Sequence, residues 1–167
     1  KSIKEILKDK LYMLAITRIL ANLSSRIIGK IKNIDEIGYI QMQRMWKYAL
    51  PLLPKLNKEY DVAISYLWPH YFVSEKVQAK RKIAWVHTDY STIETDIDMD
   101  LKMWNKFDYI MAVSEECKNA FLKKYPILKD KVKVMENITS PEFIRKMAEE
   151  HIEEDIEEDI NFKLISV

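Results

Sequence analysis

The sequence contains very few glycine and cysteine residues, and each shortage excludes a class of protein. Only two of its 167 residues are glycine, Gly29 and Gly38, so a glycine-rich loop of the kind that binds phosphate is excluded within it. The single cysteine, Cys117, cannot form a disulfide within the chain, which excludes a disulfide-stapled secreted fold. No apolar run is long enough to cross a bilayer. We therefore expect a cytoplasmic protein.

The numbers of basic and acidic residues are nearly equal, which argues against a nucleic-acid-binding domain. There are 27 lysine and arginine residues against 26 aspartate and glutamate residues, a formal net charge of +1 at pH 7. A nucleic-acid-binding domain would show a strong basic excess, so we expect no nucleic-acid partner. Hydrophobic residues make up 48% of the chain and charged residues 32%, which is typical of a globular domain with a buried core.

Three short apolar runs, each followed by polar residues and then by a helical segment, indicate the fold. The runs predict strands at 61–66, 83–87 and 108–113, and a shorter fourth strand is expected at 131–135. Strands that alternate with helices form parallel sheets with right-handed crossovers. We therefore predict an α/β fold, a Rossmann-like parallel sheet with helices on both faces. Residues 1–58 are expected to be helical, and 59–160 to form the strand–helix repeats.

The polar residues that follow these strands are the candidate site. Ligands of open α/β sheets bind beyond the carboxyl ends of the parallel strands. The candidates are His70, His87, Thr88, Asp89, Ser114 and Asn137. Structural roles are the alternatives: Asp89 either orients His87 or caps a turn, Ser114 caps a helix, and His70 packs with Trp68 on the sheet. Acidic residues do not converge from separate parts of the chain, so no metal site is predicted.

The first 32 residues form a basic segment of predicted helix. They contain eight lysine and arginine residues and two acidic residues, a net charge of +6. Apolar residues recur at helical spacing in one stripe, Ile16, Leu20, Leu23, Ile27 and Ile31. Two interpretations stay open. In one the stripe packs on the protein core, and in the other residues 1–32 lie on anionic lipid at the inner face of a membrane.

Four motifs that occur in one order carry a family resemblance. They read Y-D-V-A at 60–63, I-A-W-V-H-T-D at 83–89, F-D-Y-I followed by V-S-E across 107–115, and K-V-M-E-N-I at 133–138. In this order and spacing, residues 60–167 resemble the family 4 (group 1) glycosyltransferases. These are retaining enzymes of the GT-B fold, in which two Rossmann-like domains face each other across a cleft.

The resemblance assigns the chain to one part of such an enzyme. It implies that 1–160 is a partial amino-terminal, acceptor-side domain and that 161–167 is the first strand of a donor domain that is otherwise missing. The activity it implies is transfer of a sugar, of hexosyltransferase type and with retention, from a nucleotide sugar to a saccharide or lipid-linked acceptor. Such transfer serves the synthesis of cell-surface polysaccharide or glycolipid.

The resemblance also assigns roles to residues. His87 matches the family's histidine near the reacting centre, so it is the candidate catalytic residue. Thr88, Asp89, Ser114, Asn137 and His70 are candidate substrate contacts. The family generally needs no bound metal or cofactor, and the fragment alone is expected to be inactive because the donor domain holds the nucleotide. Asn137-Ile138 replaces the family's usual Asn-Gly. The alternative function is a non-catalytic α/β binding or interaction module.

Overall fold

The computed structural model describes residues 12–138 and 140–149. The chain divides into two compact units, Lys1–Glu136 and Asn137–Val167. The predicted strand at 161–167, and the parts of the predicted domain at 1–11 and 150–160, lie outside the described residues. The assignment of 1–160 to a single domain therefore stays a prediction.

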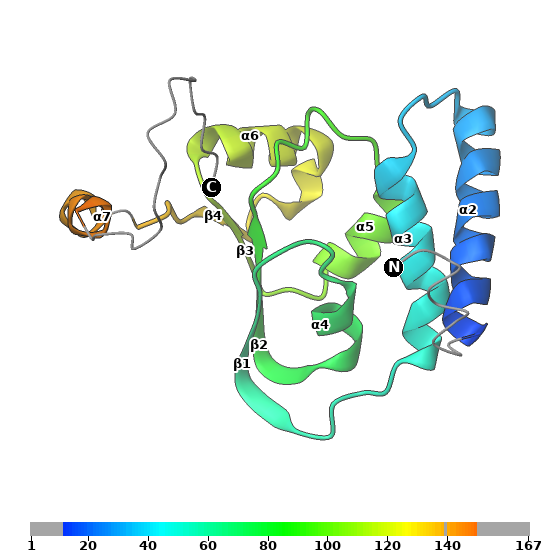
Figure 1. The fold of residues 1–167 in the computed structure, drawn as a ribbon, viewed down its shortest axis with the longest axis horizontal. Helices are drawn as coiled ribbons and strands as arrows, with labels where there is room; N and C mark the ends of the chain where they lie inside the picture. The colour runs from blue at the N-terminus through cyan, green and yellow to red at the C-terminus, as the bar shows by residue number, and fades with distance from the viewer. Residues whose placement is uncertain (1–11, 139, 150–167) are drawn as a thin grey trace, which may run out of the picture. The chain divides into compact units, whose positions relative to one another are not determined.

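The described part of the first unit alternates helices and strands after an initial pair of helices (Figure 1). The strands are β1 Glu59–Ser65, β2 Gln78–Val86, β3 Tyr109–Ala112 and β4 Val132–Val134. The α-helices are α2 Tyr12–Lys32, α3 Gly38–Ala49, α4 Tyr71–Lys76, α5 Ile97–Trp104 and α6 Glu115–Lys124, and the short 3₁₀ helices are η1 Leu50–Leu52 and η2 Pro126–Leu128. The second unit contains α7 Pro141–Ala148, which Ser140 caps through a 3.2 Å bond from Phe143 N–H to its Oγ.

The four strands form one parallel sheet in the order β1-β2-β3-β4. The register aligns Ile64 with Ile83 and Ile83 with Tyr109. The prediction of a Rossmann-like α/β sheet with parallel strands is therefore confirmed. Since successive strands are also neighbours, right-handed crossovers return each time over the same face of the sheet.

The face under these crossovers holds the core of the first unit. Ala84, Ile110 and Ala112 are fully buried there, together with Trp104 of α5 and Phe121 of α6. On the opposite face several large apolar residues stay exposed, namely Val62, Ile64, Tyr66, Tyr109 and Met135. Within residues 12–136, therefore, helices cover one face of the sheet, and the second helical layer expected from the sequence is not among them.

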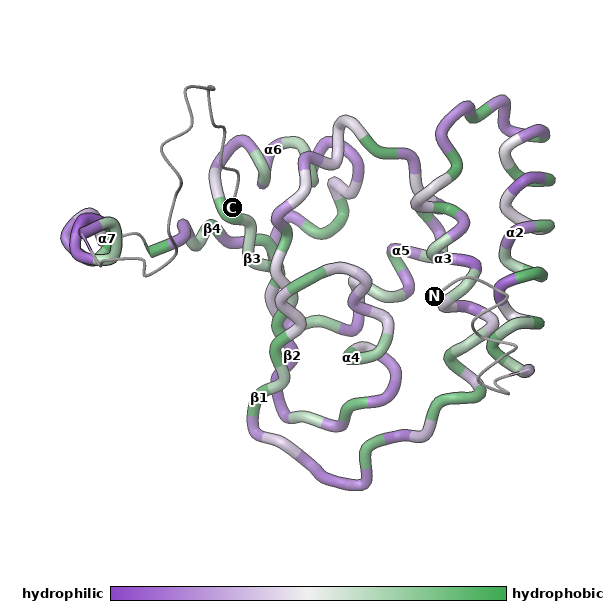
Figure 2. The backbone as a smooth tube through the Cα atoms, in the orientation of Figure 1, coloured by the Kyte–Doolittle hydropathy of each residue, from purple (hydrophilic) through white to green (hydrophobic). Residues whose placement is uncertain are grey.

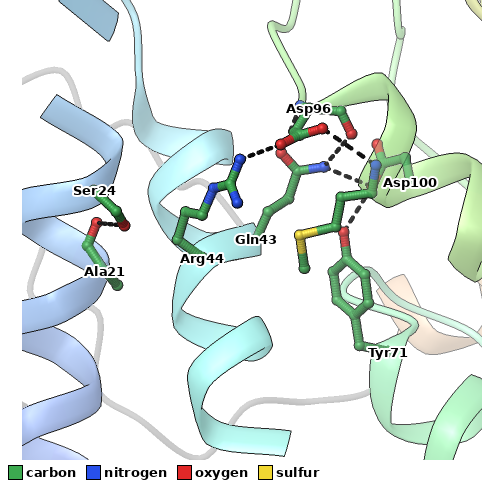
Figure 3. Close-up of polar contacts among 8 residues, drawn as sticks. Ala21, Ser24, Gln43, Arg44, Tyr71, Asp96 and Asp100 are labelled. Atoms are coloured by element: carbon green, nitrogen blue, oxygen red, sulfur yellow. Dashed lines mark hydrogen bonds and ion pairs between the residues drawn. The ribbon is translucent and has the colours of Figure 1, made fainter. Parts of the chain in front are cut away.

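An acidic side chain lies inside this core and joins four elements. Asp100 is 0% exposed. Its Oδ1 accepts hydrogen bonds of 2.7 Å from both Gln43 Nε2 and the Tyr71 hydroxyl, and its Oδ2 accepts one of 2.6 Å from the Tyr125 hydroxyl. Burial raises the pKa of the Asp100 carboxyl, and these bonds act in the opposite direction. Figure 3 shows how α3, α4 and α5 meet around it, beside the ion pair of Arg44 with Asp96.

Helix α2 packs on α3 through its small residues rather than its large ones. Ala15, Ala21, Ser25 and Gly29 are buried along this contact. A Cβ atom at Gly29 would lie 2.6 Å from Ile37 Cγ2, so only glycine allows the approach at that point. The predicted apolar stripe is exposed instead, by 45% at Leu20 and more at its other members. The interpretation that this stripe packs on the core is therefore wrong.

Candidate functional site

A small pocket lies at the carboxyl ends of β1 and β2. Trp68 belongs to the loop after β1, and His87 and Thr88 directly follow β2. The cavity has a volume of about 150 Å³. Its lining residues are Tyr39, Leu67, Trp68, His70, Trp85, Val86, His87, Thr88 and Tyr90. The structure thus brings three of the six predicted site residues, His70, His87 and Thr88, into one pocket.

Two buried polar atoms of this pocket have no hydrogen-bond partner among the described residues. They are His87 Nε2 and Trp68 Nε1. A buried polar atom without a partner costs free energy, so a ligand hydroxyl that reached either atom would bind favourably. Arg44 Nε and Trp104 Nε1 are also buried without a partner, but neither residue lines this pocket. The indole N–H can only donate, whereas the imidazole nitrogen donates or accepts according to its tautomer. Each of the two atoms can therefore form a hydrogen bond with a hydroxyl group.

Aromatic rings hold these two side chains in place. The His87 ring lies edge-on to Tyr66, with 4.6 Å between the ring centroids. Trp68 lies against Tyr39 at 5.1 Å. Tyr39 belongs to α3, so one helix of the initial pair completes a pocket whose other residues come from the end of β2 and from the segments that follow β1 and β2. The result is an aromatic wall with two polar atoms set into it.

His70 lines the pocket but is built into the protein. It is 1% exposed, its Nδ1 lies 2.8 Å from Ser65 Oγ, and its ring packs against Trp104 at 4.9 Å. The pKa of His70 is lowered to about 3, mainly by burial and also by the charge of His87, while a hydrogen bond with the backbone of Trp85 acts in the opposite direction. His70 is therefore neutral at pH 7, and it shows the packed arrangement that the sequence offered as the alternative to a substrate contact.

Asp89 shapes the loop beside the pocket. Its carboxylate accepts hydrogen bonds from the Ser91 hydroxyl at 2.6 Å and the Ser91 N–H at 2.8 Å, and the first of these is the main reason that its pKa is lowered. This is the turn-capping role, and the carboxylate is exposed to solvent. Thr88 contributes to the pocket wall, while its carbonyl accepts a 3.5 Å contact from Cys117 Sγ.

Ser114 caps α6, which is the role that the sequence offered as the alternative to a substrate contact. Its Oγ accepts a 3.1 Å hydrogen bond from the N–H of Cys117. The Cys117 thiol in turn donates to the carbonyl of Val86 at 3.3 Å, which ties the start of α6 to the end of β2. Burial raises the pKa of this thiol, so it is a packed group rather than a nucleophile. Asn137 is exposed and opens the second unit, which is described by itself.

Six of the nine lining residues were absent from the sequence-based candidates. Trp85 and Val86 lie in the motif at 83–89 and Trp68 lies two residues before the candidate His70, whereas Tyr39, Leu67 and Tyr90 lie in none of the four motifs. The available signal was indirect, because Leu67 and Tyr90 each lie within three residues of a predicted site residue. Nothing in the sequence pointed to Tyr39, since its contact with Trp68 joins positions 29 residues apart in the chain.

A larger cavity, of about 390 Å³, is lined by residues of α3, α4 and α5. Two of its charged residues have structural roles, because Arg44 is paired with Asp96 and the Asp96 side chain also caps α5 through Met99 N–H. It lies away from the carboxyl ends of the strands, and His87 and Trp68 do not line it. We therefore take the smaller pocket as the candidate site. The described residues contain no group of three or more His, Cys, Asp or Glu side chains that could hold a metal ion.

Comparison with protein-family models, with curated proteins and with solved structures finds no match for this chain. The motif resemblance and the pocket are thus the two observations from which a function can be proposed.

Proposed function

We propose that this chain is the acceptor-side domain of a retaining glycosyltransferase and that the pocket at the ends of β1 and β2 holds a sugar. The observation that carries the proposal is the pair of unpartnered polar atoms, His87 Nε2 and Trp68 Nε1, in a cavity at the carboxyl ends of parallel strands. It supports the role that the motif resemblance implies for His87.

The chemistry of the pocket suits a sugar ring. Sugars present hydroxyls around their edge and C–H groups on their faces, so an aromatic wall with a few polar atoms matches both. Tyr39 and Trp68 supply rings for the C–H groups. The Trp68 N–H donates to one hydroxyl, and the His87 imidazole forms a hydrogen bond with another.

The size of the pocket indicates how much of the substrate it holds. Sites for whole ligands measure roughly 300–1,000 Å³, whereas this one has about 150 Å³. It therefore fits one sugar ring and forms one wall of a cleft. The nucleotide diphosphate of the donor belongs on the opposite wall, in the second domain that the resemblance implies.

The reaction indicates which role each wall of the cleft has. Transfer from a nucleotide sugar leaves charge on the departing diphosphate, and stabilisation of such charge is usually the largest catalytic contribution. The donor domain supplies that stabilisation in this proposal. His87 orients a sugar hydroxyl at the reacting centre, and the acceptor is a saccharide or a lipid-linked saccharide at the inner face of a membrane.

Sugar transfer by a polypeptide that joins this chain to its donor domain tests the proposal. We expect labelled sugar to pass from a nucleotide-sugar donor to a saccharide or lipid-linked acceptor, with and without a metal chelator. The 167-residue chain assayed alone is the control and should not turn over the donor. If the joined polypeptide binds saccharide with no transfer from any donor in the panel, the chain is a binding module and the proposal is wrong.

A further inference from the structure

Helix α2 presents a continuous apolar surface to solvent along its length. Figure 2 shows hydrophobic residues recurring from one end of this helix to the other. The largest exposed fractions belong to Ile31 at 77%, Ile27 and Met13 at 58%, Tyr12 at 57% and Leu23 at 54%. Together with Ile16 these residues form what we call the α2 apolar face. No described helix, α2 included, has the length and apolarity to cross a membrane.

The opposite side of α2 is already occupied. Ala15, Ala21, Ser25 and Gly29 are buried, and the side chain of Asn22 accepts a 2.9 Å hydrogen bond from Gln41 of α3. A Cβ atom at Gly29 would lie 2.6 Å from Ile37 Cγ2, so this side of the helix is closely packed. Because the small residues are the ones packed on α3, the α2 apolar face is directed outward by the fold itself.

The charge of α2 identifies what this face contacts. Residues 12–32 contain four lysine and arginine residues and no acidic residue, whereas the whole chain carries a net charge of only +1. Arg26 and Lys30 are exposed with the apolar residues. Long basic side chains beside an apolar surface can extend to lipid headgroups while the apolar residues enter the membrane interface.

We propose that the α2 apolar face binds anionic membrane, with the helix lying in the plane of the interface. The contact of α2 with α3 keeps the helix parallel to the protein surface, which suits an in-plane arrangement. A second copy of the chain fits this face less well, because it would bring two basic helices together without counter-charge. Membrane binding goes beyond sugar transfer and does not depend on it.

Co-sedimentation of the 167-residue chain with lipid vesicles tests the proposal. We expect binding to phosphatidylcholine vesicles that contain phosphatidylglycerol, weaker binding to phosphatidylcholine alone, and a loss at high salt. Ile27→Gln should weaken binding by about tenfold, because the isoleucine side chain would be buried in the membrane interface and glutamine is polar. Lys30→Gln should weaken it by about fivefold, since one basic residue contributes about 1 kcal/mol near an anionic surface.

Two matched substitutions away from α2 serve as controls. Ile127→Gln replaces an isoleucine that is 74% exposed on η2, and Lys123→Gln replaces an exposed lysine on α6. Both should bind vesicles like the unmodified chain, and circular dichroism should show all four variants folded. Absent binding, or equal losses in the α2 variants and the controls, would overturn the proposal. So would a dimer in analytical ultracentrifugation that Ile27→Gln dissociates while the vesicles stay unbound.

Discussion

Replacement of His87 by alanine is expected to lower the rate of sugar transfer by about 10²-fold or more, the scale of losing one positioned polar group at a reacting centre. Two histidines line the pocket, and of these only His87 has a buried ring nitrogen without a hydrogen-bond partner among the described residues. Alanine removes that nitrogen and opens a space that water can enter. The measurement is kcat/KM for sugar transfer by the polypeptide that contains both domains.

A conservative variant separates the chemistry of His87 from its packing against Tyr66. His87→Gln keeps a hydrogen-bonding group of similar reach, so it should recover part of the rate that His87→Ala loses. Circular dichroism should show both variants folded, because His87 makes no hydrogen bond through Nε2 to a described residue. Full activity in a well-folded His87→Ala variant would remove His87 from the site.

Replacement of Asp100 by alanine is expected to destabilise the fold by about 3–5 kcal/mol, the cost of breaking a buried hydrogen-bonded charge network. Three donors lose the bond to Asp100, namely Gln43 Nε2 and the hydroxyls of Tyr71 and Tyr125. These donors belong to or adjoin α3, α4 and α6, so the loss affects the whole packing of the helices on the sheet. Urea unfolding followed by circular dichroism measures the change in unfolding free energy.

Asp100→Asn is the matched control, because it keeps one acceptor oxygen and removes the charge. It should cost clearly less than Asp100→Ala. Burial raises the pKa of Asp100 above the 3.8 of an unperturbed carboxyl, so the folded state binds a proton that the unfolded state has released. The unmodified protein therefore loses stability relative to Asp100→Asn as the pH rises from about 4 through the raised pKa. Equal stabilities of the alanine and asparagine variants would show that the network contributes little.

The parallel sheet could be predicted from the sequence because its signals are local. Apolar runs that end in polar residues and alternate with helical segments leave few topologies open. Local chemistry also predicted the role of Ser114 as a helix cap, since its side chain bonds an N–H three residues further along the chain. The order of the strands, and hence the single covered face among residues 12–136, depends on contacts between distant segments.

The orientation of α2 could not be predicted for a related reason. Periodicity shows which residues share a side of a helix, and it does not show which side is buried. Ala21, Ser25 and Gly29 recur at four-residue spacing just as Leu23, Ile27 and Ile31 do. The side that is buried follows from the packing of α2 on α3 and on Ile37, the residue before α3, which a Cβ at Gly29 would meet.

Some residues of the candidate site could likewise be placed from the sequence, and others could not. His87 and Thr88 could be placed because a strand end determines where they lie, and the pocket contains both. The turn made by Asp89 was one of its two open alternatives, and the structure shows it. Tyr39 could not be placed, because only the folded chain brings α3 to the loop that contains Trp68.

The claim that the strand-end pocket holds a sugar is tested most directly by nuclear magnetic resonance of the four tryptophan indole N–H groups. The ¹⁵N-labelled 167-residue chain is titrated with a panel of methyl hexosides, and Trp68→Phe assigns the pocket signal. We predict that the Trp68 signal shifts with at least one hexoside at millimolar concentration, while those of Trp46 and Trp104, which do not line the pocket, stay in place. An unchanged Trp68 signal across the whole panel would contradict the proposed sugar site.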